Sequence, residues 1–313
     1  MKSKFCILFC ATICIFLLQS NTDKKPAKES YIIQKENGRI ILAYKAFGDF
    51  LHSDKSWESY QSMLLEPYPA VLKVHRRQAK WGDLDTIQFP EQVSYYKKED
   101  FEKYMSQYDL KTINYLYDDV IDRSHQILPP ISKKEVDLCF FLPYGGGCFV
   151  IPEDTLNTIF ISMYIDPKEA EKIMAHEYAH ILHIDRRPQE SLTLKSEVVS
   201  EGMAVYLTTR ILKDIELSNS IPFMPKSSFE WCLKNEQLIK DSIRLELNDS
   251  GEQIFKRYIS DGSWAKPPVG FAEKTAYFIG YRIIEKCMDK GMSLEEICSL
   301  SSEMVIQKSE YFK

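Results

Sequence analysis

The strongest constraint in the sequence is a helix whose two ends are both marked, between residues 166 and 188. Asp166 can accept hydrogen bonds from the unpaired N–H groups of a first turn, Pro167 suits the first helical position, and Glu169 completes a capping box. Pro188 cannot continue a helix, so we expect the helix to end at about Asp185. Any fold of this chain must pack other elements around that segment.

Inside this helix, His176 and His180 lie one turn apart and project from the same face. Two imidazoles at this spacing can bind one zinc ion at about 2.0–2.1 Å. Glu177 lies beside His176, where its carboxylate can hold a metal-bound water and act as the general base. The spacing therefore predicts a metal site; two hydrogen-bonded histidines on a partly buried helix are the alternative.

A zinc site of this kind needs a third protein ligand and one open position. The second predicted helix, from Leu194 to about Lys213, carries Glu197 and Glu201 one turn apart. We predict Glu201 as the third ligand of Zn²⁺; Glu197 is the alternative, or a carboxylate that orients a histidine ring. Gly202 follows in mid-helix, where glycine costs about 1 kcal/mol relative to alanine, so it indicates a close helix approach.

These motifs resemble those of the glutamate-ligand zinc metallopeptidases, the gluzincins, and more closely those of the predicted zinc-dependent protease family typified by YjaZ. The residues that carry the resemblance are His176-Glu177-x-x-His180, Ser200-Glu201-Gly202-x-Ala204 and Tyr277-Phe278-Ile279-Gly280-Tyr281. The resemblance implies that Glu177 is the general base, and that Tyr277 and Tyr281 are catalytic residues that donate to an oxyanion. For the two tyrosines, a core helix face is the alternative.

One position departs from the thermolysin-like pattern, which has an aspartate four residues after the third ligand. Val205 occupies this position here. The ring of His176 must then be oriented by another carboxylate, and Glu197 and Asp185 are the candidates.

Short apolar runs before the marked helix predict a small sheet. We expect strands at Arg39–Phe47, Val136–Leu142, Cys148–Ile151 and Thr158–Ile165, and helices at Ser56–Lys80 and Glu99–Ile127. The resemblance implies that an edge strand before the marked helix binds extended peptide by main-chain hydrogen bonds. Its substrate contacts would be Gly146, Gly147, Cys148 and Phe149. A plain hairpin turn at the glycines is the alternative.

The N-terminus predicts export. Lys2 and Lys4 precede 14 uncharged residues, Phe5 to Leu18, a length typical of a signal peptide and short of the about 20 residues that span a bilayer. We therefore assign residues 1–20 to a signal peptide and 21–30 to a flexible tether, and expect a periplasmic, cell-envelope or secreted protein. Membrane contact would come only through an uncleaved signal or a lipid anchor. The large residues before Cys10 and Cys14 disfavour lipid attachment.

The net charge is −5 and no basic stripe is present, which argues against a nucleic-acid partner and leaves a peptide or protein substrate. Five cysteines follow the predicted signal peptide: Cys139, Cys148, Cys232, Cys287 and Cys298. Cys139 with Cys148 could bridge a hairpin, and Cys287 with Cys298 could join two C-terminal helices. Five free thiols are the alternative.

Together these observations predict an α+β, zincin-like fold, with a small mixed sheet packed on the metal-binding helix and a mainly helical C-terminal lobe. Residues 31–185 would form the first lobe, and residues 186–313 the second, which supplies the third ligand. The expected function is a zinc-dependent peptidase that hydrolyses peptide bonds with a metal-activated water. The alternative is a catalytically inactive, peptide-binding or chaperone-like exported protein of the same fold.

Overall fold

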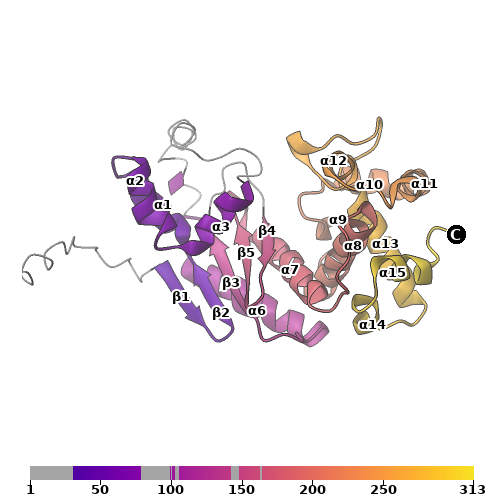
Figure 1. The fold of residues 1–313 in the computed structure, drawn as a ribbon, viewed down its shortest axis with the longest axis horizontal. Coiled ribbons are helices and arrows are strands. Elements are labelled where there is room, and N and C mark those ends of the chain that lie inside the picture. Colours follow the sequence, from indigo (N-terminus) through magenta and orange to yellow (C-terminus); the bar gives the residue numbers. More distant parts are fainter. Residues whose placement is uncertain (1–30, 79–98, 100, 103–105, 142–147, 163) are drawn as a thin grey trace, which may run out of the picture. The chain divides into compact units, whose positions relative to one another are not determined.

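The computed structural model describes residues 31–78, 99, 101–102, 106–141, 148–162 and 164–313, and Figure 1 shows how they are arranged. Residues 1–30, which include the predicted signal peptide and tether, lie outside the described residues, as do Gly146 and Gly147. Tyr31–Lys313 forms one compact unit. Its division into two lobes near residue 185 stays a prediction.

Five short strands form one mixed sheet, so the predicted α+β class is confirmed. The strands are β1 (Ile32–Lys35), β2 (Gly38–Ile41), β3 (Glu135–Phe140), β4 (Phe149–Pro152) and β5 (Leu156–Ile161), in the order β1-β2-β3-β5-β4. β2, β3 and β5 run parallel, and β1 and β4 pair antiparallel at the two edges. Because β5 lies between β3 and β4, the predicted hairpin joining Cys139 to Cys148 is wrong.

Two predicted elements of the N-terminal half have different bounds. The strand expected to reach Phe47 ends at Ile41, because helix α1 (Ala43–Leu51) begins there and buries its aromatic side chains. The segment expected as one helix from Glu99 to Ile127 is interrupted: Glu99, Phe101 and Glu102 are helical, but residues 106–109 are not. α6 spans Leu110–Ile127, and the Asp109 side chain caps it by accepting from Thr112 N at 2.6 Å. Both errors come from apolar runs whose pattern does not separate one element from the next.

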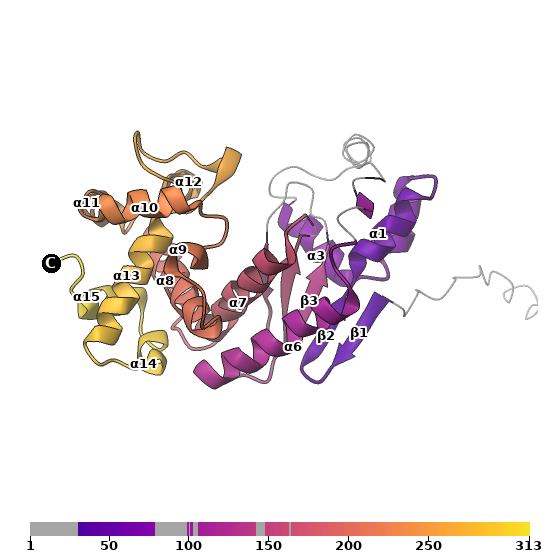
Figure 2. The ribbon, with the colours of Figure 1, turned by 180° about the vertical axis from the view of Figure 1, so that it is seen from behind.

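Helices cover both faces of the sheet. The segment expected as one helix from Ser56 forms α2 (Trp57–Tyr60), the π-helical turn η2 (Gln61–Leu65) and α3 (Pro69–Gln78). Figure 2 shows α6 and α7 in front of the sheet and α3 behind it. Lys73 of α3 donates to Thr158 of β5 at 3.2 Å, which fixes α3 to its face.

The marked helix is α7 (Pro167–Ile184), which ends at Asp185 as predicted. Asp166 caps it by accepting from Lys168 N at 2.9 Å. The predicted capping box does not form, because Glu169 instead accepts from Phe223 N and pairs with Lys172. α8 (Leu194–Ile211) follows, and it packs on α7 on one side and on α13 on the other.

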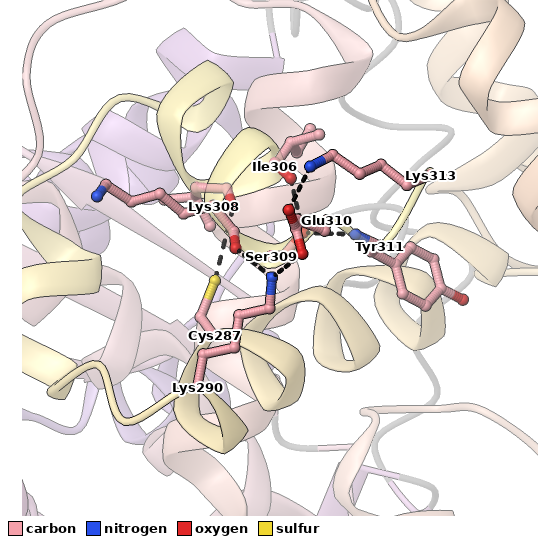
Figure 3. Close-up of polar contacts among 9 residues, drawn as sticks. Cys287, Lys290, Ile306, Lys308, Ser309, Glu310, Tyr311 and Lys313 are labelled. Atoms are coloured by element: carbon pink, nitrogen blue, oxygen red, sulfur yellow. Dashed lines mark hydrogen bonds and ion pairs between the residues drawn. The ribbon is translucent and has the colours of Figure 1, made fainter.

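The remainder of the chain is helical, as predicted. Its elements are α9 (Leu217–Ser220), α10 (Lys226–Lys234), α11 (Glu236–Glu246), α12 (Glu252–Tyr258), η4 (Gly262–Trp264), α13 (Thr275–Asp289), α14 (Leu294–Cys298) and α15 (Ser302–Ser309). Figure 3 shows how α15 is fixed: Lys290, at the end of α13, donates to Lys308 O at 3.0 Å and to Glu310 at 2.6 Å. No helix among the described residues is long and apolar enough to cross a bilayer.

The predicted close helix approach at Gly202 is confirmed. α8 and α13 cross at Gly202 and Gly280, where a Cβ on Gly280 would lie 2.7 Å from Gly202 Cα and nearer still to the carbonyl oxygen of Val198. Side chains do not fit at this distance, so two glycines let the backbones touch. The crossing brings α13 beside α8 one residue after Glu201.

The five cysteines among the described residues are all free thiols. Neither predicted disulfide forms, and the alternative of five free thiols is confirmed.

Candidate metal centre

Three side chains from two helices meet at one point. His176 Nε2 lies 3.0 Å from Glu201 Oε2, and His180 Nε2 lies 3.5 Å from the same oxygen. The two imidazole rings are nearly perpendicular, with centroids 4.8 Å apart. One potential ligand atom from each residue lies within 4.8 Å of the others, so the group could hold a metal ion. The histidines come from α7 and the carboxylate from α8.

Charge and burial fit this group to a cation. Burial alone would lower the pKa of His180, but the neighbouring Glu201 carboxylate outweighs it and raises that pKa to about 9. Burial opposes ionisation of Glu201 too, and yet His180 and His176 hold its pKa well below the usual range. The carboxylate therefore stays ionised, and His180 supplies positive charge that a metal ion would otherwise provide.

Glu197, the alternative ligand, is not a member of this group. Burial, followed by the repulsion of Glu201, raises the pKa of Glu197 to about 7. A carboxyl group that is half protonated near neutral pH is a poorer metal ligand than an ionised one. Glu201 is therefore the residue of the two that the geometry favours.

The surroundings of the two rings differ. Ser200 Oγ lies 3.3 Å from Nδ1 of His180, which orients this ring and leaves Nε2 directed at Glu201. The Nδ1 atom of His176 is buried and has no hydrogen-bond partner among the described residues. The predicted partners Glu197 and Asp185 do not reach it; Asp185 instead accepts from Ser132 and Lys134. That prediction is wrong because Asp185 lies at the far end of α7.

The predicted catalytic residues do not all gather here. Glu177 is 9% exposed, and its charge acts on His180 and Tyr277. The Tyr277 ring stacks on His176, with centroids 5.8 Å apart and planes at 20°. Tyr281 turns away: its hydroxyl donates to Glu285 at 3.2 Å and its ring lies against Tyr206. The structure thus brings Tyr277 to the metal group and leaves Tyr281 outside it.

Two of the predicted substrate contacts can be placed. Cys148 Sγ accepts from Ser162 N at 3.4 Å, and the Phe149 ring lies against Phe160 with centroids 5.1 Å apart. β4 is the edge strand next to α7, as expected. Whether these residues contact a ligand stays a prediction.

Sequence reasoning missed two residues here: Ser200, which contacts His180, and Lys274, which contacts the Tyr277 ring. Ser200 directly precedes Glu201 in the Ser200-Glu201-Gly202 motif, so the sequence could have indicated that it lies near the site. Lys274 carried no signal, because the groups that bind its ammonium, Pro222 O and Asp261, lie far from it in the chain.

Comparison with known proteins identifies the family. The family model described as "Gliding motility protein GldB", a lipoprotein family, matches residues 153–313, more than half of the chain. The matched part includes His176, His180 and Glu201. No curated protein matches the chain.

This match corrects the sequence-based assignment. The family is one of gliding-motility lipoproteins and not of zinc metallopeptidases, so the resemblance to gluzincins and to the YjaZ-like family is wrong. The predicted peptidase function, with its hydrolase and metalloprotease assignment, is wrong with it. The physical reason is that His-Glu-x-x-His specifies only one face of one helix, and the same face can hold a metal ion without any substrate site beside it.

The match agrees with the coarser prediction of an exported protein of the cell envelope. Because the family is one of lipoproteins, the match favours lipid attachment, which the large residues before Cys10 and Cys14 had argued against. The chain belongs to the family of the gliding motility protein GldB.

Proposed function

We propose that this chain is a non-hydrolytic, exported component of a gliding-motility apparatus, held in the cell envelope, whose fold is cross-linked by one zinc ion. His176, His180 and Glu201 would hold the ion. The chain would act by binding a protein or peptide partner, as a catalytically inactive protein with a zincin-like arrangement of sheet and helices. The observation that carries the proposal is the family match over the part of the chain that contains the metal group.

Zinc is the metal that this donor set favours. Two imidazole nitrogens and one carboxylate oxygen are ligands that zinc commonly takes in proteins, with a fourth position left for water or another group. A set of hard oxygens alone would have favoured magnesium or calcium.

The position of the group supports a role in the fold. α7 packs on β4 and β5, whereas α8 packs on α13 and α15. An ion shared by α7 and α8 would therefore tie the sheet to the C-terminal helices. A ligand that binds the folded state alone stabilises it by about 2.7 kcal/mol when its free concentration is 100 times Kd.

Two variants separate the roles of the group. Glu201→Ala removes a proposed ligand, and Glu177→Gln removes a carboxylate beside the site while keeping its shape. Each would replace the native gene in the cells that produce the protein. Gliding on a surface and zinc content of the purified protein would then be measured.

We expect deletion of the gene to abolish gliding. Glu201→Ala should lose zinc, with reduced protein and reduced gliding, while Glu177→Gln should keep both zinc and gliding. If Glu177→Gln stopped gliding with zinc retained, the chain would act by catalysis and the non-hydrolytic role would be refuted. Unaffected gliding after deletion would refute the proposed role altogether.

A further inference from the structure

The metal group is covered on the α13 side by a set of contacts that meet at one lysine. We propose that Lys274 is a positioning residue: it latches Tyr277 over His176 and so sets the rate at which the metal ion enters and leaves. The inference rests on the zinc binding proposed above, and it adds how the site is closed.

The Lys274 ammonium is enclosed by four groups. It lies 2.8 Å from Pro222 O and 2.7 Å from Asp261 Oδ2, and over the rings of Phe223 and Tyr277, at 5.2 and 5.0 Å from their centroids. The side chain is 6% exposed. A lysine ammonium is rarely buried to this degree unless oxygens and aromatic faces replace its water. The Lys274 ammonium therefore holds together three segments of the chain: the one with Pro222 and Phe223, the one with Asp261, and the start of α13 with Tyr277.

The backbone at this point is strained. Lys274 has φ 56° and Phe223 has φ 59°, so both residues adopt the left-handed conformation that side chains with a Cβ disfavour. Such conformations persist only where surrounding contacts hold them. The two strained residues touch each other through the Lys274 ammonium and the Phe223 ring. Loss of the ammonium would release both.

These contacts close a ring over α7. Phe223 N donates to Glu169 Oε1, two turns before the metal group, at 3.2 Å. At the other end, the Tyr277 ring lies on the ring of His176. Lys274 joins the two ends, because it contacts both Phe223 and Tyr277. The cover is thus attached to α7 at two points and held together at its centre by Lys274.

Two of the three proposed ligands are nearly closed off from solvent, since His176 is 2% exposed and Glu201 is 9% exposed, and the third is partly buried, with 12% of the His180 side chain exposed. A metal ion held by such residues leaves only when the structure around them opens locally, and the rate follows the population of the open state. Weakening the latch should therefore speed release without requiring global unfolding.

Release of zinc to an excess of chelator tests the inference on the full exported protein. Lys274→Met keeps the apolar stem and removes the ammonium, and Asp261→Asn weakens the latch from the exposed side. Lys256→Met is the matched control, because Lys256 also has one ion pair, with Glu252, and lies over one ring, Trp264. The unfolding free energy of each variant is measured in urea beside the release rate.

We expect release about tenfold faster in Lys274→Met and about threefold faster in Asp261→Asn, with the control within about twofold of wild type. Hydrogen exchange should rise at residues 221–224 and 261–274 in the first two variants. If zinc release from Lys274→Met is faster only by the amount that its lower free energy of unfolding explains, as in the control, the inference is overturned. If Lys274→Met does not fold, an unchanged rate in Asp261→Asn overturns it. Absence of zinc from the wild-type protein would instead refute the proposed function.

Discussion

Substitution of Gly280 by alanine tests the close crossing of α8 and α13. Gly280 is helical with an ordinary negative φ, so alanine in a free helix would stabilise this position by about 1 kcal/mol. At the crossing of α8 and α13, however, the new Cβ would lie 2.7 Å from Gly202 Cα, where ordinary contacts begin at 3.4 Å. The carbonyl oxygen of Val198 lies nearer still to the new Cβ, so the helices must separate by more than about 0.7 Å.

The cost of this separation follows from what it opens. The carbonyl oxygen of Val198 and the Cα of Gly202 are both backbone atoms, so no side-chain rotation can relieve their clash with the new Cβ. A gap of 0.5–1 Å removes roughly a quarter to a half of the dispersion energy of each contact across it, and overpacked cores lose about 1–3 kcal/mol. After the gain in helix propensity is subtracted, we expect a net loss of about 2 kcal/mol or more in the free energy of unfolding.

Urea denaturation of the metal-free protein measures this loss. Ala276→Gly, one turn earlier on α13, is the control, and it should lose about 1–2 kcal/mol through helix propensity and one buried methyl group. Zinc affinity should also fall in Gly280→Ala, because Glu201 precedes Gly202 at the crossing. The reasoning is refuted if Gly280→Ala proves more stable than wild type, since this is the behaviour of an uncrowded helical glycine.

Three further predictions concern metal, pH and thiols. Removing zinc with a chelator should lower the free energy of unfolding in urea by about 2.7 kcal/mol, relative to protein in free zinc at 100 times Kd. An unchanged urea midpoint would contradict metal binding. Burial, with the charges of Arg187 and His180, lowers the pKa of His183 to about 3, so the unfolded chain binds a proton between pH 6.5 and 3 that the folded chain does not. Stability of the metal-free protein should therefore fall as pH falls through this range, less steeply in His183→Gln, and parallel curves would contradict this. Burial raises the pKa of the five thiols among the described residues, so these thiols should resist alkylation in the native protein and react fully in the denatured protein. One of them that stays unreactive after denaturation would indicate a covalent bond.

Local chemistry made much of the metal site predictable. Asp166 and Pro167 fixed the start of α7, and helical periodicity then placed His176 and His180 on one face. The antiparallel return of α8 was within reach of a short connection, so Glu201 could be predicted. Gly202 indicated a close crossing, although nothing in its neighbourhood named Gly280 as the partner.

The incorrect predictions have two causes. Strand and helix patterns overlap in short apolar runs, so the end of β2 was misplaced and the break before α6 was missed. The need for a carboxylate that orients His176 was taken from the pattern of a family to which the chain does not belong. A motif of five residues reports the face of a helix, and it carries no information about elements that pack on that face from elsewhere in the chain.

The sequence by itself determined the α+β class, the bounds of α7 and the three side chains that could share an ion, because caps and helical periodicity act over a few residues. Only the tertiary structure decided the strand order, the glycine crossing and the cover held by Lys274. These depend on groups far apart in the chain, such as Pro222, Asp261 and Tyr277, which meet only after the helices have packed.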